Sequence, residues 1–227
     1  MAVMAYHIDF QSLGFDYLKM RLTGEDLIPS QVPLRDGLND NAAALMKAGI
    51  ENLESLSVIL ESKKKLAELA EKSGVDAGYL NILGRALRGY RPKPHALADY
   101  PLIDEDLVGK LAGTGIRTSA DLYDAAAARG KRSELAGLLG ADESRLAELV
   151  RLSDLSRIQW VSPIFARLLH DAGYRTIKAV SSAKATDLCR DVAACNGRLG
   201  LFKGKIGERD MGRLVFLAAM LDSEVEE

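Results

Sequence analysis

The chain has 227 residues, of which 48% are hydrophobic and 27% are charged, as in an ordinary globular protein. Its formal net charge of −2 provides no overall basic field, so contact with nucleic acid would depend on local patches. No apolar run approaches the roughly 18 residues of a membrane span, and the opening segment lacks the features of a signal peptide. Cys189 and Cys195 fit no zinc-ligand spacing, and we expect a reduced, cytoplasmic protein with no membrane partner.

Apolar residues recur at helical spacing along almost the whole chain, and no segment alternates in the way that indicates a strand. We therefore predict an all-α protein in which short helices are joined at glycines. In chain order, the predicted parts are an N-terminal helix and irregular segment (1–30), a first helical repeat unit (31–89), a linker (90–101), second and third units with a C-terminal helix (102–222), and an acidic tail (223–227).

The chain contains internal repeats, which bear directly on its architecture. A Gly-Ile pair begins at Gly49 and again at Gly115, and each pair is followed 25 residues later by a second glycine, Gly74 or Gly140. A third, partial copy surrounds Gly173. Helices of this length are not stable alone, and glycine at a helix end permits a tight reversal. The repeats therefore predict stacked helical units.

Two predicted hairpins precede glycines of the repeat by the same interval. Ile103 lies twelve residues before Gly115, and Val161 lies twelve residues before Gly173. Further matching features are Leu-x3-Gly-Ile at 45–50 and 111–116, Leu-Ser-Asp-Leu at 152–155, and the segment 165–174. From Leu27 to Leu221 the chain resembles a tandem helix-hairpin-helix family catalogued only as a domain of unknown function. The resemblance implies an all-α tandem array of short helix-hairpin-helix-like units, with no assigned reaction.

In helix-hairpin-helix proteins, which this chain resembles, two hairpin glycines let backbone N–H groups approach a nucleic-acid phosphate at a helix start. In the first of the two hairpins, Leu102 and Asp104 stand in the glycine positions, and three successive carboxylates begin at Asp104. We expect these charges to repel a nucleic-acid backbone. In the other hairpin, Trp160 and Ser162 hold the glycine positions, and Ser162 could donate to a phosphate. As the only tryptophan, Trp160 is expected to pack between units rather than to stack on bases.

The segment 203–213 fits phosphate chemistry better than either hairpin. Gly207 occupies the second glycine position there, and the cations around it are Lys203, Lys205, Arg209 and Arg213. Backbone amides at a helix start, together with nearby lysine and arginine, are what phosphate contact requires. The alternative is an exposed turn whose cations pair with Glu208 or with the acidic tail, as charge runs usually do.

A second basic cluster consists of Arg85, Arg88, Arg91 and Lys93, with no acid between them. This cluster could follow a phosphate backbone or bind an acidic partner. The alternative interpretation is structural, with favourable positive charge at the end of a predicted helix over 77–88 and a stiff proline-containing linker after it.

The sequence offers no constellation of residues typical of catalysis. It has no phosphate-binding glycine loop and no metalloprotease or serine-hydrolase motif, and His7, His95 and His170 lie far apart. Acidic residues at predicted helix starts, such as Asp104 and Asp142, are explained as helix caps. We therefore expect no enzymatic activity, no cofactor, no metal and no small-molecule substrate.

The sequence leaves two interpretations open. In the first, the chain is a non-enzymatic binding protein that holds DNA or RNA through phosphates without sequence readout. Its contacts would be 203–213, supported by 85–93, and binding would be weak and strongly salt-dependent. In the second, the chain is a protein–protein interaction scaffold whose degenerate hairpins pack against a partner or another copy. The family resemblance favours the first interpretation, whereas the missing glycines and the net charge favour the second.

Overall fold

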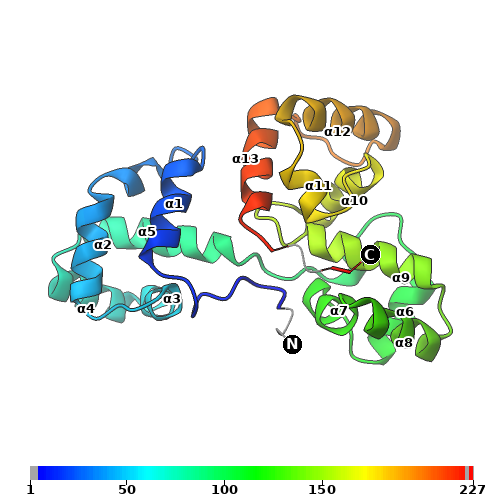
Figure 1. The fold of residues 1–227 in the computed structure, drawn as a ribbon, viewed down its shortest axis with the longest axis horizontal. Coiled ribbons are helices and arrows are strands. Elements are labelled where there is room, and N and C mark those ends of the chain that lie inside the picture. The colour runs from blue at the N-terminus through cyan, green and yellow to red at the C-terminus, as the bar shows by residue number, and fades with distance from the viewer. Residues whose placement is uncertain (1–4, 223–224, 227) are drawn as a thin grey trace. The chain divides into compact units, whose positions relative to one another are not determined.

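The computed structural model describes residues 5–222 and 225–226, and Figure 1 shows them as helices and connecting segments. Within the described residues there is no strand, and a single isolated bridge joins Ala96 to Thr118. The prediction of an all-α protein is therefore confirmed. Across the same residues, no helix combines the length and the apolar character needed to cross a membrane.

The part of the chain that the structure describes contains thirteen α-helices and two short 3-10 helices. In chain order they are α1 (Phe15–Gly24), η1 (Val32–Arg35), α2 (Leu38–Lys47), α3 (Leu53–Glu61), α4 (Lys63–Ser73), α5 (Ala77–Tyr90), η2 (Leu97–Asp99), α6 (Glu105–Gly113), α7 (Ser119–Ala126), α8 (Arg129–Leu139), α9 (Glu143–Leu155), α10 (Pro163–Asp171), α11 (Ile177–Ser181), α12 (Ala185–Leu199) and α13 (Glu208–Ala219). Eight of these α-helices begin after an Asn, Ser, Asp or Thr whose side chain accepts a hydrogen bond from the first turn, as predicted for Asp104 and Asp142.

The chain forms two compact units, each with its own hydrophobic core. One unit comprises residues 8–91 with α1 to α5. The other combines residues 5–7 with the described part of 92–227, which carries α6 to α13. The division after Arg91 falls inside the segment predicted as a linker, and α1 packs into the core of the first unit.

In the unit of residues 8–91, α3, α4 and α5 pack against one another, and α2 contacts α1 and α4. Leu56 on α3 and Leu83 on α5 are fully buried between them. The two helices approach closely at Gly84, where a β-carbon would lie 3.1 Å from the β-carbon of Leu60. Burial of these leucine faces is what makes such short helices stable.

In the unit of α6 to α13, α7, α8 and α9 pack together, α10 contacts α9 and α12, and α13 packs on α11 and α12. Leu122 of α7, Leu149 of α9 and Leu168 of α10 are all buried in one core. A continuous core therefore runs through the helices on which both predicted hairpins depend.

Three helix ends share one local geometry. After α2, α6 and α10 the chain reverses at Gly49, Gly115 and Gly173, whose φ angles are 93°, 91° and 100°. At each end the next residue donates its N–H to the carbonyl oxygen five residues earlier, at 3.1, 3.1 and 2.9 Å. Residues with a β-carbon are strained at such φ angles, so glycine suits these positions. Gly74 and Gly140, the second glycines of the sequence repeat, end α4 and α8 at φ angles of 74° and 55°.

A buried guanidinium ties the N-terminal residues to the helices of the larger unit. Arg157 donates to the carbonyl oxygen of Tyr6 at 2.9 Å, to the hydroxyl of Tyr123 at 2.8 Å and to the carboxylate of Asp154 at 2.7 Å. It also reaches the carbonyl oxygen of Asp222 at 3.3 Å. One side chain therefore joins α7, α9 and segments from opposite ends of the chain.

Part of the predicted acidic tail is bound to α8. Residues 223, 224 and 227 lie outside the described residues, but the carboxylate of Glu226 accepts the N–H of Arg129 at 2.8 Å. Arg132 donates to the carbonyl oxygen of Glu226 at 2.7 Å. Since Ala128, at the N-cap of α8, has no capping side chain, Glu226 supplies the missing cap.

Candidate nucleic-acid interface

The predicted cations Lys203 and Lys205 lie on the loop between α12 and α13, and both are exposed. The loop is held by α12, because the side chain of Asn196 accepts from the N–H of Phe202 and donates to its carbonyl oxygen, each at 2.8 Å. Gly200 starts the loop at a φ angle of 64°. The two lysines are therefore presented from a fixed stretch of backbone.

Gly207 is the N-cap of α13, but its geometry is that of an ordinary residue. Its φ angle is −116°, and a β-carbon there would meet only Asp210, at the ordinary contact distance of 3.6 Å. The first turn already carries Glu208 and Asp210, and Arg213 pairs with Asp210 at 3.1 Å. Arg209 is exposed beside them. Because these carboxylates lie where a phosphate would bind, the start of α13 fits the alternative of an exposed turn that pairs with acids, and the acid that pairs with Arg213 is Asp210, which was not among the expected partners.

Ser162 and the lysine loop are brought together by two aromatic rings. The hydroxyl oxygen of Ser162 caps α10 by accepting the N–H of Phe165 at 3.3 Å, and Ser162 is exposed. Phe165 meets Phe202 edge to face, with ring centroids 5.7 Å apart and ring planes at 82°. Since Phe202 directly precedes Lys203, the lysine loop lies beside the start of α10. Two segments that the sequence singled out separately, the start of α10 and the loop of Lys203, are thus in contact through these rings.

Trp160, in the turn between α9 and α10, is unusual in exposure and in backbone conformation. It is 50% exposed, and its φ angle of 71° lies in the left-handed region. A residue with a β-carbon reaches this region at a cost of about 1–2 kcal/mol, which is why glycine is usual there. The expected packing role accounts for only half of the indole. The other half is exposed to solvent, and Ile164, four residues further along the chain, is 37% exposed.

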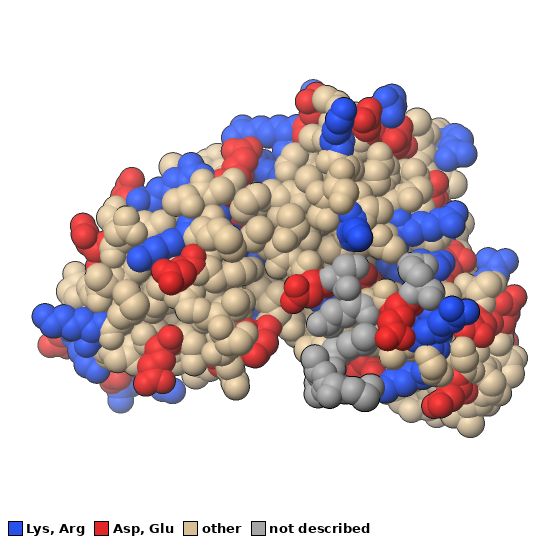
Figure 2. All heavy atoms as spheres, viewed as in Figure 1, with Lys and Arg blue, Asp and Glu red and all other residues tan. Residues whose placement is uncertain are grey.

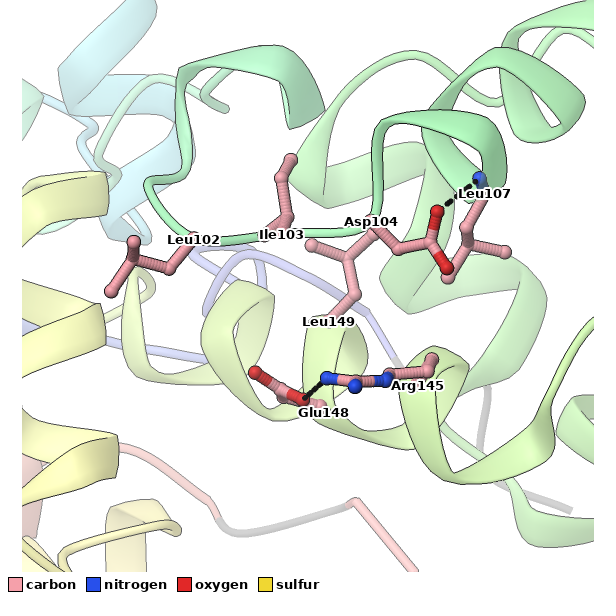
Figure 3. Close-up of a pocket in the computed structure, with 7 residues that line it drawn as sticks. All are labelled: Leu102, Ile103, Asp104, Leu107, Arg145, Glu148 and Leu149. Atoms are coloured by element: carbon pink, nitrogen blue, oxygen red, sulfur yellow. Dashed lines mark hydrogen bonds and ion pairs between the residues drawn. The ribbon is translucent and has the colours of Figure 1, made fainter.

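Leu102 occupies the matching position in the other hairpin, between η2 and α6. Its φ angle is 58° and it is 61% exposed. In Figure 3 its side chain points away from the other labelled residues, and Ile103 points to the opposite side of the chain. Asp104 caps α6 by accepting the N–H groups of Asp106 and Leu107 at 3.0 and 3.2 Å. A carboxylate therefore occupies this helix start, as the cap interpretation predicted.

Arg167 on α10 clamps the turn that carries Leu102. Its buried guanidinium donates to the carbonyl oxygens of Pro101 and Leu102 at 3.0 and 3.1 Å. The same guanidinium pairs with Glu148 on α9 and, at 3.2 Å, with Asp171. The strained turn is therefore fixed by a side chain 65 positions further along the chain.

A buried hydrogen bond links the bases of the two hairpins. The hydroxyl of Tyr100, two residues before Leu102, donates to the hydroxyl oxygen of Ser156 at 2.7 Å. Ser156 follows α9 and leads into the turn of Trp160. Burial raises the pKa of Tyr100 above its ordinary value, because the charged phenolate would lose its hydration.

The second basic cluster is divided in the structure. Arg85 and Arg88 are exposed on α5, and Lys93 is exposed but belongs to the other unit. Arg91 is half-buried. Its guanidinium contacts the carboxylate of Glu54, the carbonyl oxygen of Ile8 at 3.3 Å and the ring of Phe10 at 3.9 Å. Arg85 and Arg88 therefore form the exposed part of this cluster on residues 8–91.

Lys and Arg are interspersed with Asp and Glu on the visible face of each unit (Figure 2), with no broad field of one sign. Local groups of residues, rather than overall charge, must therefore decide what each surface attracts. Among the residues that the structure describes, no group of three or more His, Cys, Asp and Glu could hold a metal ion.

The fold places the chain among all-helical proteins, and comparison with known proteins identifies its family. Residues 101–220 match the family described as Domain of unknown function (DUF4332). The match covers more than half of the chain, so the chain belongs to this family. No curated protein and no solved structure matches the chain. The family match includes the turns of Leu102 and Trp160, whereas residues 8–91 lie outside it.

Proposed function

We propose that the chain is a non-enzymatic binding protein that holds single-stranded nucleic acid by its backbone. The contact, called here the Trp160–Lys205 surface, consists of Trp160, Ser162, Phe202, Lys203 and Lys205. The observation that supports it most is the contact of Phe165 with Phe202, because it puts an exposed lysine loop beside the capped start of α10.

Each part of the Trp160–Lys205 surface supplies one element of backbone recognition. Lys203 and Lys205 would neutralise phosphates, and counterion release would make this binding salt-dependent. The hydroxyl oxygen of Ser162 accepts from the helix backbone, so its hydrogen remains to be donated to a phosphate oxygen. The exposed face of Trp160 offers a stacking partner to an unpaired base. None of these contacts reads base edges, so no sequence preference is expected.

A tandem helix-hairpin-helix-like arrangement is part of the same proposal. Three glycine-ended helices of matching geometry support it, and so do the left-handed φ angles of Leu102 and Trp160, where such motifs carry a glycine. In this arrangement the hairpin before α10 binds phosphate. The hairpin before α6 does not, because Asp104 would repel it. Arg85 and Arg88 would add a second, weaker contact.

The test uses Trp160 as its own probe, because it is the only tryptophan in the chain. A short single-stranded oligonucleotide and the matching duplex are titrated into the full chain at about 50 mM and about 200 mM salt. We expect the single strand to quench the emission of Trp160, to bind more tightly than the duplex, and to lose affinity as salt rises. Each lysine contact should contribute about 0.7 to the slope of log affinity against log salt.

A charge-reversed variant tests the surface itself. Lys203→Glu/Lys205→Glu should lose affinity for the single strand by about tenfold or more, because two phosphate contacts become repulsive. Its matched control is Lys63→Glu/Lys64→Glu, the same charge change at the exposed start of α4. Equal losses in both double variants, or no binding by the native chain at low salt, would contradict the proposal. Absence of binding at low salt would favour the other interpretation of the sequence, that the chain is a protein–protein interaction scaffold.

A further inference from the structure

Leu102 is an exposed apolar residue in a backbone conformation that favours glycine. Its φ angle is 58°, and it is 61% exposed. Leu102 lowers the stability of the folded state in two ways: its backbone is strained in the left-handed region, and its apolar side chain is exposed to water. Strained residues of this kind are concentrated at binding and switch sites. The side chain of Leu102 is therefore a candidate contact in its own right.

The turn that presents Leu102 is preorganised. The buried guanidinium of Arg167 holds the carbonyl oxygens of Pro101 and Leu102 at 3.0 and 3.1 Å. Tyr100, directly before this turn, is fixed by its 2.7 Å hydrogen bond to Ser156. A surface held in this way has little conformational freedom left to lose when a partner binds, which favours affinity.

An open hollow of about 670 Å³ lies beside Leu102. Its wall includes the apolar residues Pro101, Ile103 and Val108, and Glu105 is the only charged residue among those that line it. Its volume is within the range of ordinary binding pockets, roughly 300–1,000 Å³. The hollow can therefore accept apolar side chains of a partner while placing one carboxylate beside them.

The chain segment that lines the hollow is predominantly acidic in sequence. The segment 98–110 carries four carboxylates and one cation, namely Asp99, Asp104, Glu105, Asp106 and Lys110. The single cation is paired with Asp106 at 2.9 Å. On the other side of the hairpin, Arg145 pairs with Glu148 at 3.6 Å (Figure 3). Among the residues that line the hollow, Glu105 thus places a carboxylate next to the apolar residues, and further carboxylates are close to it in the sequence.

We infer that the Leu102 turn docks a basic amphipathic segment of a partner protein. The apolar side chains of that segment fill the hollow against Leu102, and its lysine or arginine side chains face Asp99 and Glu105. Charge selects this occupant, because a nucleic-acid backbone is repelled and an acidic segment places like charges together. The oppositely charged Trp160–Lys205 surface is not part of this site.

The test uses two synthetic helical peptides that share a leucine face and differ only in lysine or glutamate on the polar face. Binding to the full chain is measured by fluorescence polarisation of the labelled peptides. We expect the lysine peptide to bind and the glutamate peptide not to bind. Leu102→Gly and Glu105→Lys should each weaken the lysine peptide by about tenfold or more. Glycine is chosen because it accepts a φ angle of 58° and so preserves the turn.

Two controls separate this inference from loss of folding and from the proposed function. Glu134→Lys makes the same charge change at an exposed position of α8 and should alter peptide affinity by less than about twofold. Lys203→Glu/Lys205→Glu should weaken nucleic-acid binding and leave peptide binding intact. Urea midpoints show that each variant is folded. Equal affinity for the two peptides, or unchanged binding in both Leu102→Gly and Glu105→Lys, overturns the inference.

Discussion

The turns of Leu102 and Trp160 have similar backbone conformations and opposite chemical surroundings. Each places an exposed apolar residue at a left-handed φ angle, 58° or 71°, two residues before the cap of a helix. Leu102 is followed by the run of carboxylates that begins at Asp104, whereas α10, the helix that follows Trp160, contacts the loop of Lys203 through Phe165 and Phe202. Hairpin geometry alone therefore does not determine the charge next to each turn. The neighbouring residues, some of them distant in sequence, supply the chemistry.

The largest expected effect concerns the clamp on the Leu102 turn. Arg167→Met should lower the free energy of unfolding by about 3 kcal/mol, because it leaves Glu148 and two backbone carbonyls without their buried partner. Urea denaturation measures this loss. Arg145→Met is the matched control, since Arg145 is largely exposed and should cost less than about 0.5 kcal/mol. Similar losses of unfolding free energy in the two variants would mean that Arg167 stabilises the fold no more than an exposed arginine does.

The two hairpins also differ in the side chain that caps the following helix. Asp104→Ala and Ser162→Ala should each cost about 1 kcal/mol of stability, since each removes the acceptor for N–H groups in a first turn. Asp104→Asn and Ser162→Asp retain an acceptor and serve as controls in the same urea measurement. An alanine variant as stable as the native chain would show that the observed cap is energetically silent.

Substitutions at the tips of the turns separate backbone strain from lost side-chain contacts. At Leu102 and at Trp160, we expect the glycine variant to be more stable than the alanine variant by up to about 1 kcal/mol, because glycine tolerates positive φ angles. At Glu134, inside α8, the order should reverse by about the same amount. Thermal and urea unfolding of the three pairs provide the comparison. If the alanine variant were the more stable one at Leu102 and Trp160 as well as at Glu134, the left-handed conformations of the two turns would be contradicted.

The smallest expected effect on stability at neutral pH comes from the hydrogen bond between Tyr100 and Ser156, which lies at the base of both turns. Burial raises the pKa of Tyr100 above 10.0, so the folded state favours the neutral phenol. The contribution of the neutral Tyr100 phenol to the free energy of unfolding is complete below pH 10.0 and is lost as the pH rises through the raised pKa. Tyr100→Phe has no proton to lose, so its urea midpoint should fall less steeply with alkaline pH than that of the native chain. Parallel curves would show that Tyr100 does not contribute to the loss of stability at alkaline pH.

Features set by nearby residues could be predicted from the sequence. Helical spacing predicted the all-α fold, and the repeated glycines marked reversals such as those at Gly49 and Gly115. The caps at Asp104 and Asp142 follow from residue type at a helix start. The sequence also aligned Leu102 with a hairpin glycine position, and that alignment was already a signal for its positive φ angle.

Contacts between distant residues could not be predicted in this way. Phe165 and Phe202 are 37 positions apart, and nothing in their spacing indicates that the rings meet. Arg91 had the pattern of an exposed cation, yet Phe10 and Glu54 hold its side chain. In both cases tertiary packing determines the surroundings of a residue whose local sequence is uninformative.

The hydrogen bond from Arg91 to the carbonyl oxygen of Ile8, at 3.3 Å, makes neighbours of the two ends of the 8–91 unit. The described residues before Ile8 and those after Arg91 belong to the other unit, so the 8–91 unit begins and ends at neighbouring positions. Joining His7 to Pro92 through a few flexible residues should excise it and leave the other unit, which contains the residues of the family match, folded. The excised module could then be transplanted into a loop of an unrelated protein, because its closely spaced ends require little room.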